Sequence, residues 1–441
     1  MPKHSLDRTI WNIAWPAILS NISIPLLGLV DAAILGHLGS NRYLGAVAIG
    51  SALLSFLYWG FGFLRMGTTG LVARAVGADN SKQAQLILAQ SVVLALVLAS
   101  LVWLLHPLWL GIGFALMAPQ SEVLGLAESY ASIRISSAPA VLTTYAVVGW
   151  CIGRQDTRWP LLIVVSTNLC NIVLDVVFII GLDMRSDGAA LATVFSEYLG
   201  CAIAIFTVWR VYPQRPPRDL LPTLMRWSGY QHLLQANRHL FVRTICLLAS
   251  LAFFTAAGDK LGGDILAANA LLMQLLFVSA YAMDGFAFAA EGLSGQRLGG
   301  QDLAGFYQSV RRCGLWCAVT ALVMSLLLLV FKAPLFDLLT DLDALRKLLD
   351  QYAWWLILMP LAAGPSYLLD GVFIGSAETR HMMVTMVISA ALVYLPAWYF
   401  TQSWGNHGLW FAFFLFSAAR GLTLYVSYLY LSHKNAWLKA S

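Results

Sequence analysis

Long apolar stretches recur along the whole chain, separated by short polar segments. The hydrocarbon core of a bilayer is about 30 Å thick, and an α-helix crosses it with about 20 apolar residues. Twelve stretches reach this length, at residues 11–36, 44–75, 84–111, 123–153, 159–182, 187–211, 232–258, 264–297, 307–331, 347–375, 380–401 and 406–431. Backbone groups that face lipid must bond within their own segment, so we expect each stretch to be a helix.

Composition supports the same assignment. Charged residues make up 11% and apolar residues 59% of the 441 positions, whereas soluble domains carry about 25% charged residues. The chain cannot cover itself with a charged surface, so we expect an all-α integral membrane protein. The net charge of +5 is modest and indicates no nucleic-acid partner.

The two halves of the chain repeat each other. Residues 44–77 align without a gap with residues 266–299, an offset of 222. At the same offset, four further residues of the first half recur in the second: Gly149, Gly153, Thr157 and Arg158 align with Gly371, Gly375, Thr379 and Arg380. Six spans per repeat give both halves the same direction through the membrane, and such parallel repeats are common in secondary transporters.

This repeat predicts two pseudo-symmetric six-helix lobes. We assign residues 1–209 to the N-lobe and 232–441 to the C-lobe. The basic, proline-rich segment 210–231 between them is expected to be a cytoplasmic linker, because its prolines interrupt helical structure.

Lysine and arginine predict the orientation. If the N-terminus is cytoplasmic, the inner segments carry sixteen of these residues and the outer loops only six. The positive-inside rule then places both termini in the cytoplasm.

Ionisable residues interrupt several spans. An ionisable group in the bilayer is costly and usually faces a bundle interior or a hydrated cavity. The candidates are Asp31, Arg65, Asp175, Glu197, Asp284, Glu291 and Asp370. Arg238 and Arg243 of the seventh span are natural counter-ions for the C-lobe acids. Those acids either form salt bridges within the lobe or contact a substrate.

The fifth span carries a polar stripe. Asn168, Asn171 and Asp175 have the spacing i, i+3 and i+7, which places them on one helix face, and Thr193 of the sixth span can bond to the same group. The stripe indicates the lining of a hydrated pocket. Interhelical hydrogen bonding without a transport role is the alternative.

The first span combines an acid with prolines. Asp31 shares it with Pro16 and Pro25, each of which lacks a helical N–H and permits a bend. Burial disfavours the charged form of a carboxylate, so Asp31 can take up a proton and release a cation. A structural pair of Asp31 with Arg65 is the alternative.

Several strings resemble the multidrug and toxic compound extrusion (MATE) transporters, and most closely their DNA-damage-inducible F (DinF) branch. They are SNISIPLLGLVDAAILGHLG, FLRMGTTGLVARAVGA, NIVLDVVFIIGL, GAALATVFSEY, YAMDGFAFAAEGLSGQ and YLLDGVFIG. The resemblance implies a V-shaped antiporter that exchanges protons or sodium for amphipathic, often cationic, compounds. It also implies that Asp31 is the proton-coupling residue, with Asn171, Asp175 and Thr193 as neighbours, and that the first helix bends at Pro16.

Sodium-coupled relatives of this family place a glutamate on the seventh helix near an aspartate on the tenth. Asp370 matches the aspartate, but the seventh span here has no acid. The resemblance therefore favours protons over sodium as the coupling ion.

The combined expectation is a multidrug efflux transporter of the bacterial inner membrane. It would work as a monomer surrounded by lipid, with no cofactor and no metal site. Its coupling residues would be Asp31, Asp175, Asn171 and Thr193, and its helix-bending residues Pro16 and Pro25. The supporting residues of the substrate cavity would be Asn168, Asn21, Arg65, Asp284 and Asp370.

A lipid-linked glycan flippase and a sodium-coupled exporter are the alternatives that remain open. An intramembrane enzyme is disfavoured because no nucleophile or metal cluster has suitable spacing. A channel is disfavoured because no filter motif occurs.

Overall fold

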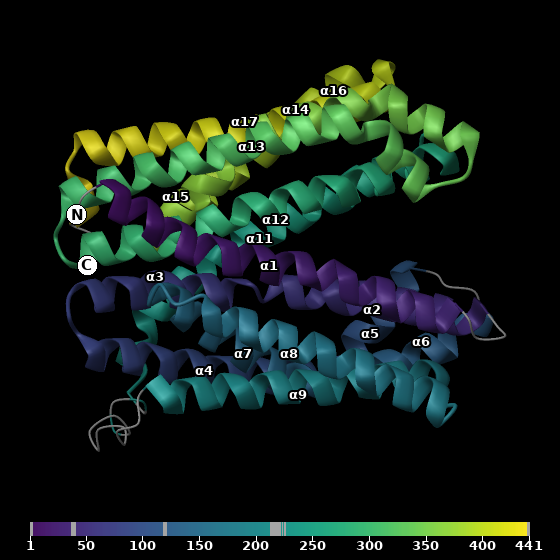
Figure 1. The fold of residues 1–441 in the computed structure, drawn as a ribbon, viewed down its shortest axis with the longest axis horizontal. Coiled ribbons are helices and arrows are strands. Elements are labelled where there is room, and N and C mark those ends of the chain that lie inside the picture. Colours follow the sequence, from purple (N-terminus) through teal and green to yellow (C-terminus); the bar gives the residue numbers. More distant parts are fainter. Residues whose placement is uncertain are drawn as a thin grey trace. The chain divides into compact units, whose positions relative to one another are not determined.

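The structure is a computed structural model. It describes residues 3–36, 41–117, 121–211, 222, 224 and 226–438, and some side chains within these ranges, including those of residues 24–27, 29, 31 and 32, lie outside the described part. Every regular element in the described ranges is helical (Figure 1). The expected all-α membrane architecture is confirmed.

The described residues of the first half form nine α-helices. They are α1 (Lys3–Gly36), α2 (Asn41–Gly60), α3 (Phe63–Gly77), α4 (Ser81–Leu104), α5 (His106–Met117), α6 (Ser121–Arg134), α7 (Ala138–Gly153), α8 (Arg158–Asp175) and α9 (Arg185–Val211). The described second half contains α11 (Gln231–Asp259), α12 (Gly263–Gly299), α13 (Leu303–Leu339), α14 (Asp343–Gly375), α15 (Thr379–Ile388), α16 (Leu395–Thr401) and α17 (Asn406–His433).

Eleven helical stretches of the described chain are long and apolar enough to span a membrane. They correspond to the second through twelfth predicted spans, and α1 covers the first. The third prediction, 84–111, was too long, because α4 ends at Leu104 and α5 begins at His106. Pro107 follows at once, and proline is accepted in the first turn of a helix rather than in its interior.

The chain divides into two compact units. Unit 1 comprises Met1–Ile18, Ala73–Asn80 and Gln235–Ser441, and unit 2 comprises Leu19–Val72 and Ser81–Leu234. Helices α1, α3 and α11 therefore each contribute to both units. The predicted linker, 210–231, lies mostly outside the described residues.

The start of α1 is held within unit 1 by contacts to α12 and α13. Asp7 forms an ion pair with Arg312 (3.2 Å) and accepts a hydrogen bond from the indole of Trp316 (3.2 Å). One turn later, the ring of Trp11 meets those of Phe286 and Trp316 edge to face. These contacts explain why the first eighteen residues belong to the unit formed by the second half.

The sequence repeat is reproduced in the loops. Gln155 and Ala377, offset by 222, both adopt positive φ, at 63° and 60°. The residue after each donates to the carbonyl five positions earlier, Asp156 to Cys151 and Glu378 to Phe373, both at 3.0 Å. Asp79 and Gln301, at the same offset, likewise share a positive φ.

The glycines of the repeat mark close helix contacts. A Cβ at Gly149 would overlap the carbonyl oxygen of Arg65, and a Cβ at Gly371 would overlap that of Ala287. Both partners of the first contact are offset by 222 from those of the second. The glycines shared by the two repeats thus let equivalent backbone segments approach each other in both halves.

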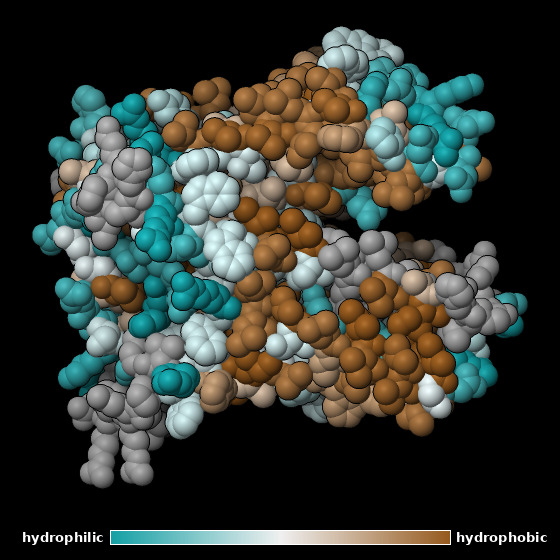
Figure 2. Space-filling view, viewed as in Figure 1, coloured by the Kyte–Doolittle hydropathy of each residue, from teal (hydrophilic) through white to brown (hydrophobic). Residues whose placement is uncertain are grey.

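Each unit presents an apolar surface along its helices. In Figure 2 apolar side chains cover the middle part of the visible helices of unit 1, and hydrophilic ones gather at the ends. On α13 the exposed side chains include Leu322, Leu326 and Val330. Such a surface is expected where helices face lipid.

Candidate functional site

The polar stripe of the fifth span is buried in unit 2. Asn171 and Asp175 have 0% exposure and Thr193 has 8%, whereas Leu169 and Val173 on the opposite face of α8 are each 60% exposed. The predicted helix face is therefore the inward one. We call Asn171, Asp175 and Thr193 the Asn171 cluster.

The amide of Asn171 lies between the other two members of the cluster, and only one of its two orientations fits them. With the nitrogen turned toward Thr193, it would face the backbone N–H of Thr193 at 3.1 Å, and the amide oxygen would face Asp175 Oδ2 at 3.1 Å. Donor would then meet donor and acceptor would meet acceptor.

The opposite orientation of the amide satisfies both neighbours. The nitrogen then donates to Asp175 Oδ2 (3.1 Å), and the oxygen accepts from the hydroxyl (3.2 Å) and the backbone N–H (3.1 Å) of Thr193. An ionised carboxylate accepts hydrogen bonds only, so this orientation fits the charged form of Asp175.

Local backbone geometry places Asp175 at a special position. It is the last residue of α8, and the π-helical segment Val176–Gly181 follows directly. Single π-helical turns are rare and often occur at functional sites. The second half also has a π-helical segment, Ser389–Tyr394, between α15 and α16.

The Asn171 cluster does not recur in the second half. At an offset of 222, Asn171 and Asp175 align with Val393 and Ala397. At an offset of 220, which aligns Gly188 with Gly408, Thr193 aligns with Phe413. All three counterparts are apolar. The cluster is therefore an addition to the repeated framework rather than a part of it.

Asn168, one turn before the cluster, binds α1 instead. Its amide donates to the backbone oxygen (3.1 Å) and the hydroxyl (3.2 Å) of Ser23. Asn21, half-buried, is also on α1. The side chains of Asp31 and Pro25 lie outside the described part, so their predicted roles stay predictions.

The remaining residues predicted in the first half are dispersed. Arg65 is half-buried on α3, and its carbonyl oxygen is the one that Gly149 approaches. Pro16 is buried in the part of α1 that belongs to unit 1.

A half-buried ion pair in unit 2 was not assigned from the sequence. Arg134 of α6 binds Glu197 of α9 at 2.9 Å, and also donates to the hydroxyl of Tyr130 (3.2 Å). That hydroxyl in turn contacts the hydroxyl of Ser51 on α2 (2.8 Å). The sequence did indicate such a pair, because Arg134 lies inside a predicted span and an arginine in the membrane is expected to pair with an acid.

Unit 1 holds a second polar group around Asp370 of α14. The carboxylate oxygen Oδ2 accepts hydrogen bonds from Arg243 of α11 and from Arg420 of α17, the latter at 2.9 Å. All three residues are buried. We call them the Asp370 triad.

The triad confirms only one of the two counter-ions expected in the seventh span. Arg243 binds Asp370, but Arg238 is exposed, and its place is taken by Arg420 of the last helix. Helix phase explains the difference, since residues 238 and 243 are five apart and point to different faces. Asp284 on α12 is half-buried.

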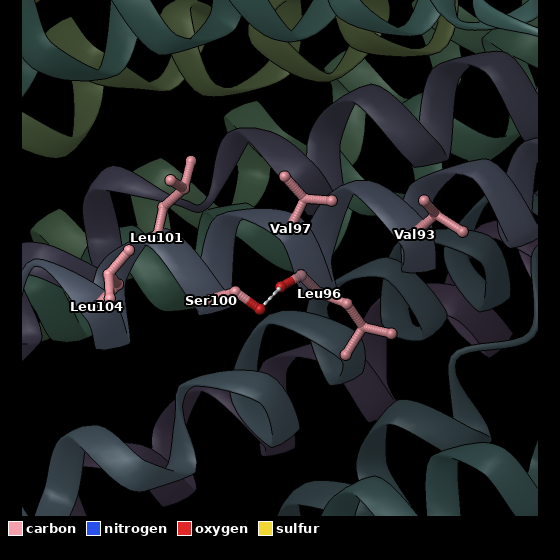
Figure 3. Close-up of a pocket in the computed structure, with 6 residues that line it drawn as sticks. All are labelled: Val93, Leu96, Val97, Ser100, Leu101 and Leu104. Atoms are coloured by element: carbon pink, nitrogen blue, oxygen red, sulfur yellow. Dashed lines mark hydrogen bonds between the residues drawn. The ribbon is translucent and has the colours of Figure 1, made fainter.

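No group of three or more His, Cys, Asp or Glu side chains within the described ranges is arranged to hold a metal ion. A shallow groove of about 390 Å³ runs along α4, lined by Val93, Leu96, Val97, Ser100, Leu101 and Leu104 (Figure 3). Its single polar side chain, Ser100, donates to the carbonyl of Leu96 on its own helix (2.8 Å). The groove thus offers no polar group to orient a solute, and suits a lipid chain.

Comparison with known proteins agrees with this architecture. The MatE family model matches residues 16–177 and 240–400. The chain is 38% identical to DNA damage-inducible protein F of Escherichia coli K12, over 95% of this chain and 91% of that protein. It is 27% identical to Protein DETOXIFICATION 44, chloroplastic, of Arabidopsis thaliana, over 94% of this chain and 81% of the relative.

A solved structure of the Vibrio cholerae MATE transporter VcmN in its bent form is also similar. The TM-score is 0.87 at 22% sequence identity, and 99% of each chain is covered. At this identity the likeness shows that the fold is shared.

Proposed function

Since this chain belongs to the MatE family of multidrug efflux transporters, and so is a transporter and not an enzyme, we propose that it exports amphipathic cations in exchange for protons. It acts as a monomer in the bacterial inner membrane, with both termini in the cytoplasm. Asp31, on α1, and Asp175, in the Asn171 cluster, carry the coupling protons.

The observation that carries this proposal is the Asn171 cluster. A carboxylate enclosed by an amide and apolar helices accepts a hydrogen bond from the amide nitrogen of Asn171 when it is charged. A neutral carboxyl group is a weaker acceptor, so uptake of a proton by Asp175 weakens this bond.

Asn171 also joins Asp175 to α9, because its amide oxygen accepts from the hydroxyl and the backbone N–H of Thr193. A change of charge on α8 can therefore act on α9 through this amide, which supports a coupling role.

The Asp370 triad supports protons over sodium. Two guanidinium groups already occupy the carboxylate of Asp370, and a sodium ion would have to displace a charge-assisted hydrogen bond to reach it.

Transport by alternating access requires the two units to move. Helix α1 passes from unit 1 to unit 2 after Ile18, two residues beyond Pro16. A proline removes one helical hydrogen bond and so lowers the resistance of the helix to bending. This position supports Pro16 as the hinge of α1.

The test is ethidium efflux in energised inverted vesicles. We expect an imposed proton gradient to drive transport by the wild type and by Asp183→Asn, an exposed acid in the loop after α8 that serves as control. Asp31→Asn and Asp175→Asn should lose at least nine-tenths of it. Equal driving by a sodium gradient, or full activity of both test variants, would refute the proposal.

A further inference from the structure

The Asp370 triad contains more positive than negative charge. Two arginines share one carboxylate oxygen, and the exposure of Arg243, Arg420 and Asp370 is only 5%, 6% and 7%. A buried charge without a partner is strongly unfavourable. The second guanidinium therefore calls for another negative group.

Both arginines of the triad also have an N–H group that lacks a hydrogen-bond acceptor. In the described part of the chain, neither Arg243 Nε nor Arg420 Nε has a hydrogen-bond partner, although both atoms are buried. Each arginine uses Nη2 to bind Asp370. A guanidinium edge presents Nε and a terminal nitrogen side by side, a geometry that fits the two oxygens of a carboxylate, sulfonate or phosphate.

The other charged and titratable groups near the triad come from α12 and α14. Tyr367 lies within electrostatic range of Asp284, Asp370, Arg243 and Arg420. Asp284 is the second acid of this region, and both it and Tyr367 are half-buried. An incoming anion would compete with Asp284 for the surplus positive charge.

Aromatic rings pack beside Arg420. The guanidinium of Arg420 lies 5.7 Å from the ring centre of Phe416, whose ring lies 5.2 Å from that of Tyr394. An arginine held against an aromatic face in a dry environment keeps its charge and its fork geometry. The region thus combines cationic donors with apolar walls.

We propose that the Asp370 triad binds the anionic group of an amphipathic compound with a single carboxylate or sulfonate, through Arg243 and Arg420. This inference rests on the proposed efflux function and widens it: the N-lobe acids serve cations, and the C-lobe arginines admit organic anions and zwitterions. One surplus positive charge suits a singly charged group better than a phosphate with two.

Equilibrium dialysis of the purified full chain in detergent tests the proposal. The probes are naphthalene-1-sulfonate, its uncharged analogue naphthalene-1-sulfonamide, and methanesulfonate, which has the charge without the apolar body. We expect the wild type to bind the sulfonate at least tenfold more tightly than the sulfonamide. Methanesulfonate binding as tight as that of naphthalene-1-sulfonate would overturn the amphipathic class.

Three variants separate the anion site from general effects. Arg420→Gln leaves Asp370 with Arg243 as partner, so we expect a folded protein that binds the sulfonate at least tenfold more weakly and the sulfonamide unchanged. Arg420→Lys should restore part of the affinity. Asp284→Asn removes the competing acid and should tighten sulfonate binding severalfold.

Arg134→Gln, which removes a half-buried arginine of unit 2, is the matched control and should leave sulfonate binding unchanged. An equal loss of sulfonate and sulfonamide binding in Arg420→Gln, or no loss in either Arg420 variant, would overturn the inference. Proton-driven ethidium efflux by the same variants is measured alongside. Efflux that persists while sulfonate binding is absent would reject the anion site and leave the proposed function standing.

Discussion

Side chains of the same type have different energetic roles according to their burial. Arg42 and Glu122 form an ion pair at 3.5 Å, but their side chains are 61% and 72% exposed. Pairs of that kind contribute about 0–1 kcal/mol. The Asp370 triad and the Arg134–Glu197 pair are mostly buried, and loss of one partner from a buried pair costs about 3–5 kcal/mol. The acids that pair with these arginines therefore contribute much more to stability than the acid of the exposed pair does.

Asn171→Leu tests the amide link between Asp175 and Thr193 at the residue scale. Leucine has a similar size but neither donates nor accepts, so it cannot join these two residues. We expect proton-driven ethidium efflux to fall at least tenfold, with the amount of protein in the membrane unchanged.

The control is Asn168→Leu, on the same face of α8, whose amide binds Ser23 rather than an acid. It should reduce efflux by less than half. If both variants pump like the wild type, Asn171 has no part in coupling.

At the scale of single helices, Pro16 is the position to test in α1. Alanine would supply the N–H that proline lacks, and this N–H would donate a helical hydrogen bond to the carbonyl of Asn12. Conformational steps commonly limit turnover, so we expect Pro16→Ala to slow efflux severalfold while the Kd for ethidium stays within about twofold. Equal maximal rates in wild type and variant would argue against bending at this position.

The close contact of α14 with α12 makes Gly371 sensitive. A methyl group there would overlap the carbonyl oxygen of Ala287, and overpacking of this kind costs about 1–3 kcal/mol. We expect Gly371→Ala to lower the Tm of the detergent-purified protein.

Gly125→Ala is the control, because nothing lies within 4 Å of a Cβ at that glycine of α6. Its Tm should be unchanged or slightly higher. An unchanged Tm in Gly371→Ala as well would mean that α12 and α14 can separate without loss.

Hydrophobic length and the repeat predicted the helices well, because each span must satisfy its backbone within itself. The spacing of Asn168, Asn171 and Asp175 also predicted which face of α8 is buried. The partners of the charged residues were harder to predict. Arg420 lies fifty residues from Asp370 along the chain, and no periodicity within one helix indicates which neighbour faces it. The π-helical turn after Asp175 has no sequence signal in the run VVFIIG.

At the scale of the whole molecule, the predicted orientation can be tested by labelling. Asp341, in the turn before α14, and His433, at the end of α17, are both exposed. In spheroplasts, a membrane-impermeant maleimide should label Asp341→Cys but not His433→Cys, and lysis should expose the second. Labelling of His433→Cys before lysis would place the C-terminus outside.

The parent chain is the control for background labelling. Of its six cysteines, Cys151, Cys201, Cys313 and Cys317 are buried, and Cys170 and Cys246 are half-buried. We expect little reaction from it under the same conditions. Strong labelling of the parent would require these two half-buried residues to be replaced first.

One glycine contact in unit 1 is reciprocal. A Cβ at Gly77 would overlap the carbonyl of Gln296, and a Cβ at Gly299 would overlap that of Arg74. Residues 77 and 299 are offset by 222, and so are 74 and 296, so each repeat gives the other the same contact that it receives. Identical subunits bind in this way across a two-fold axis. This contact between the two repeats therefore has the symmetry of a homodimer interface. The two partners belong to one polypeptide, so they need not associate from solution.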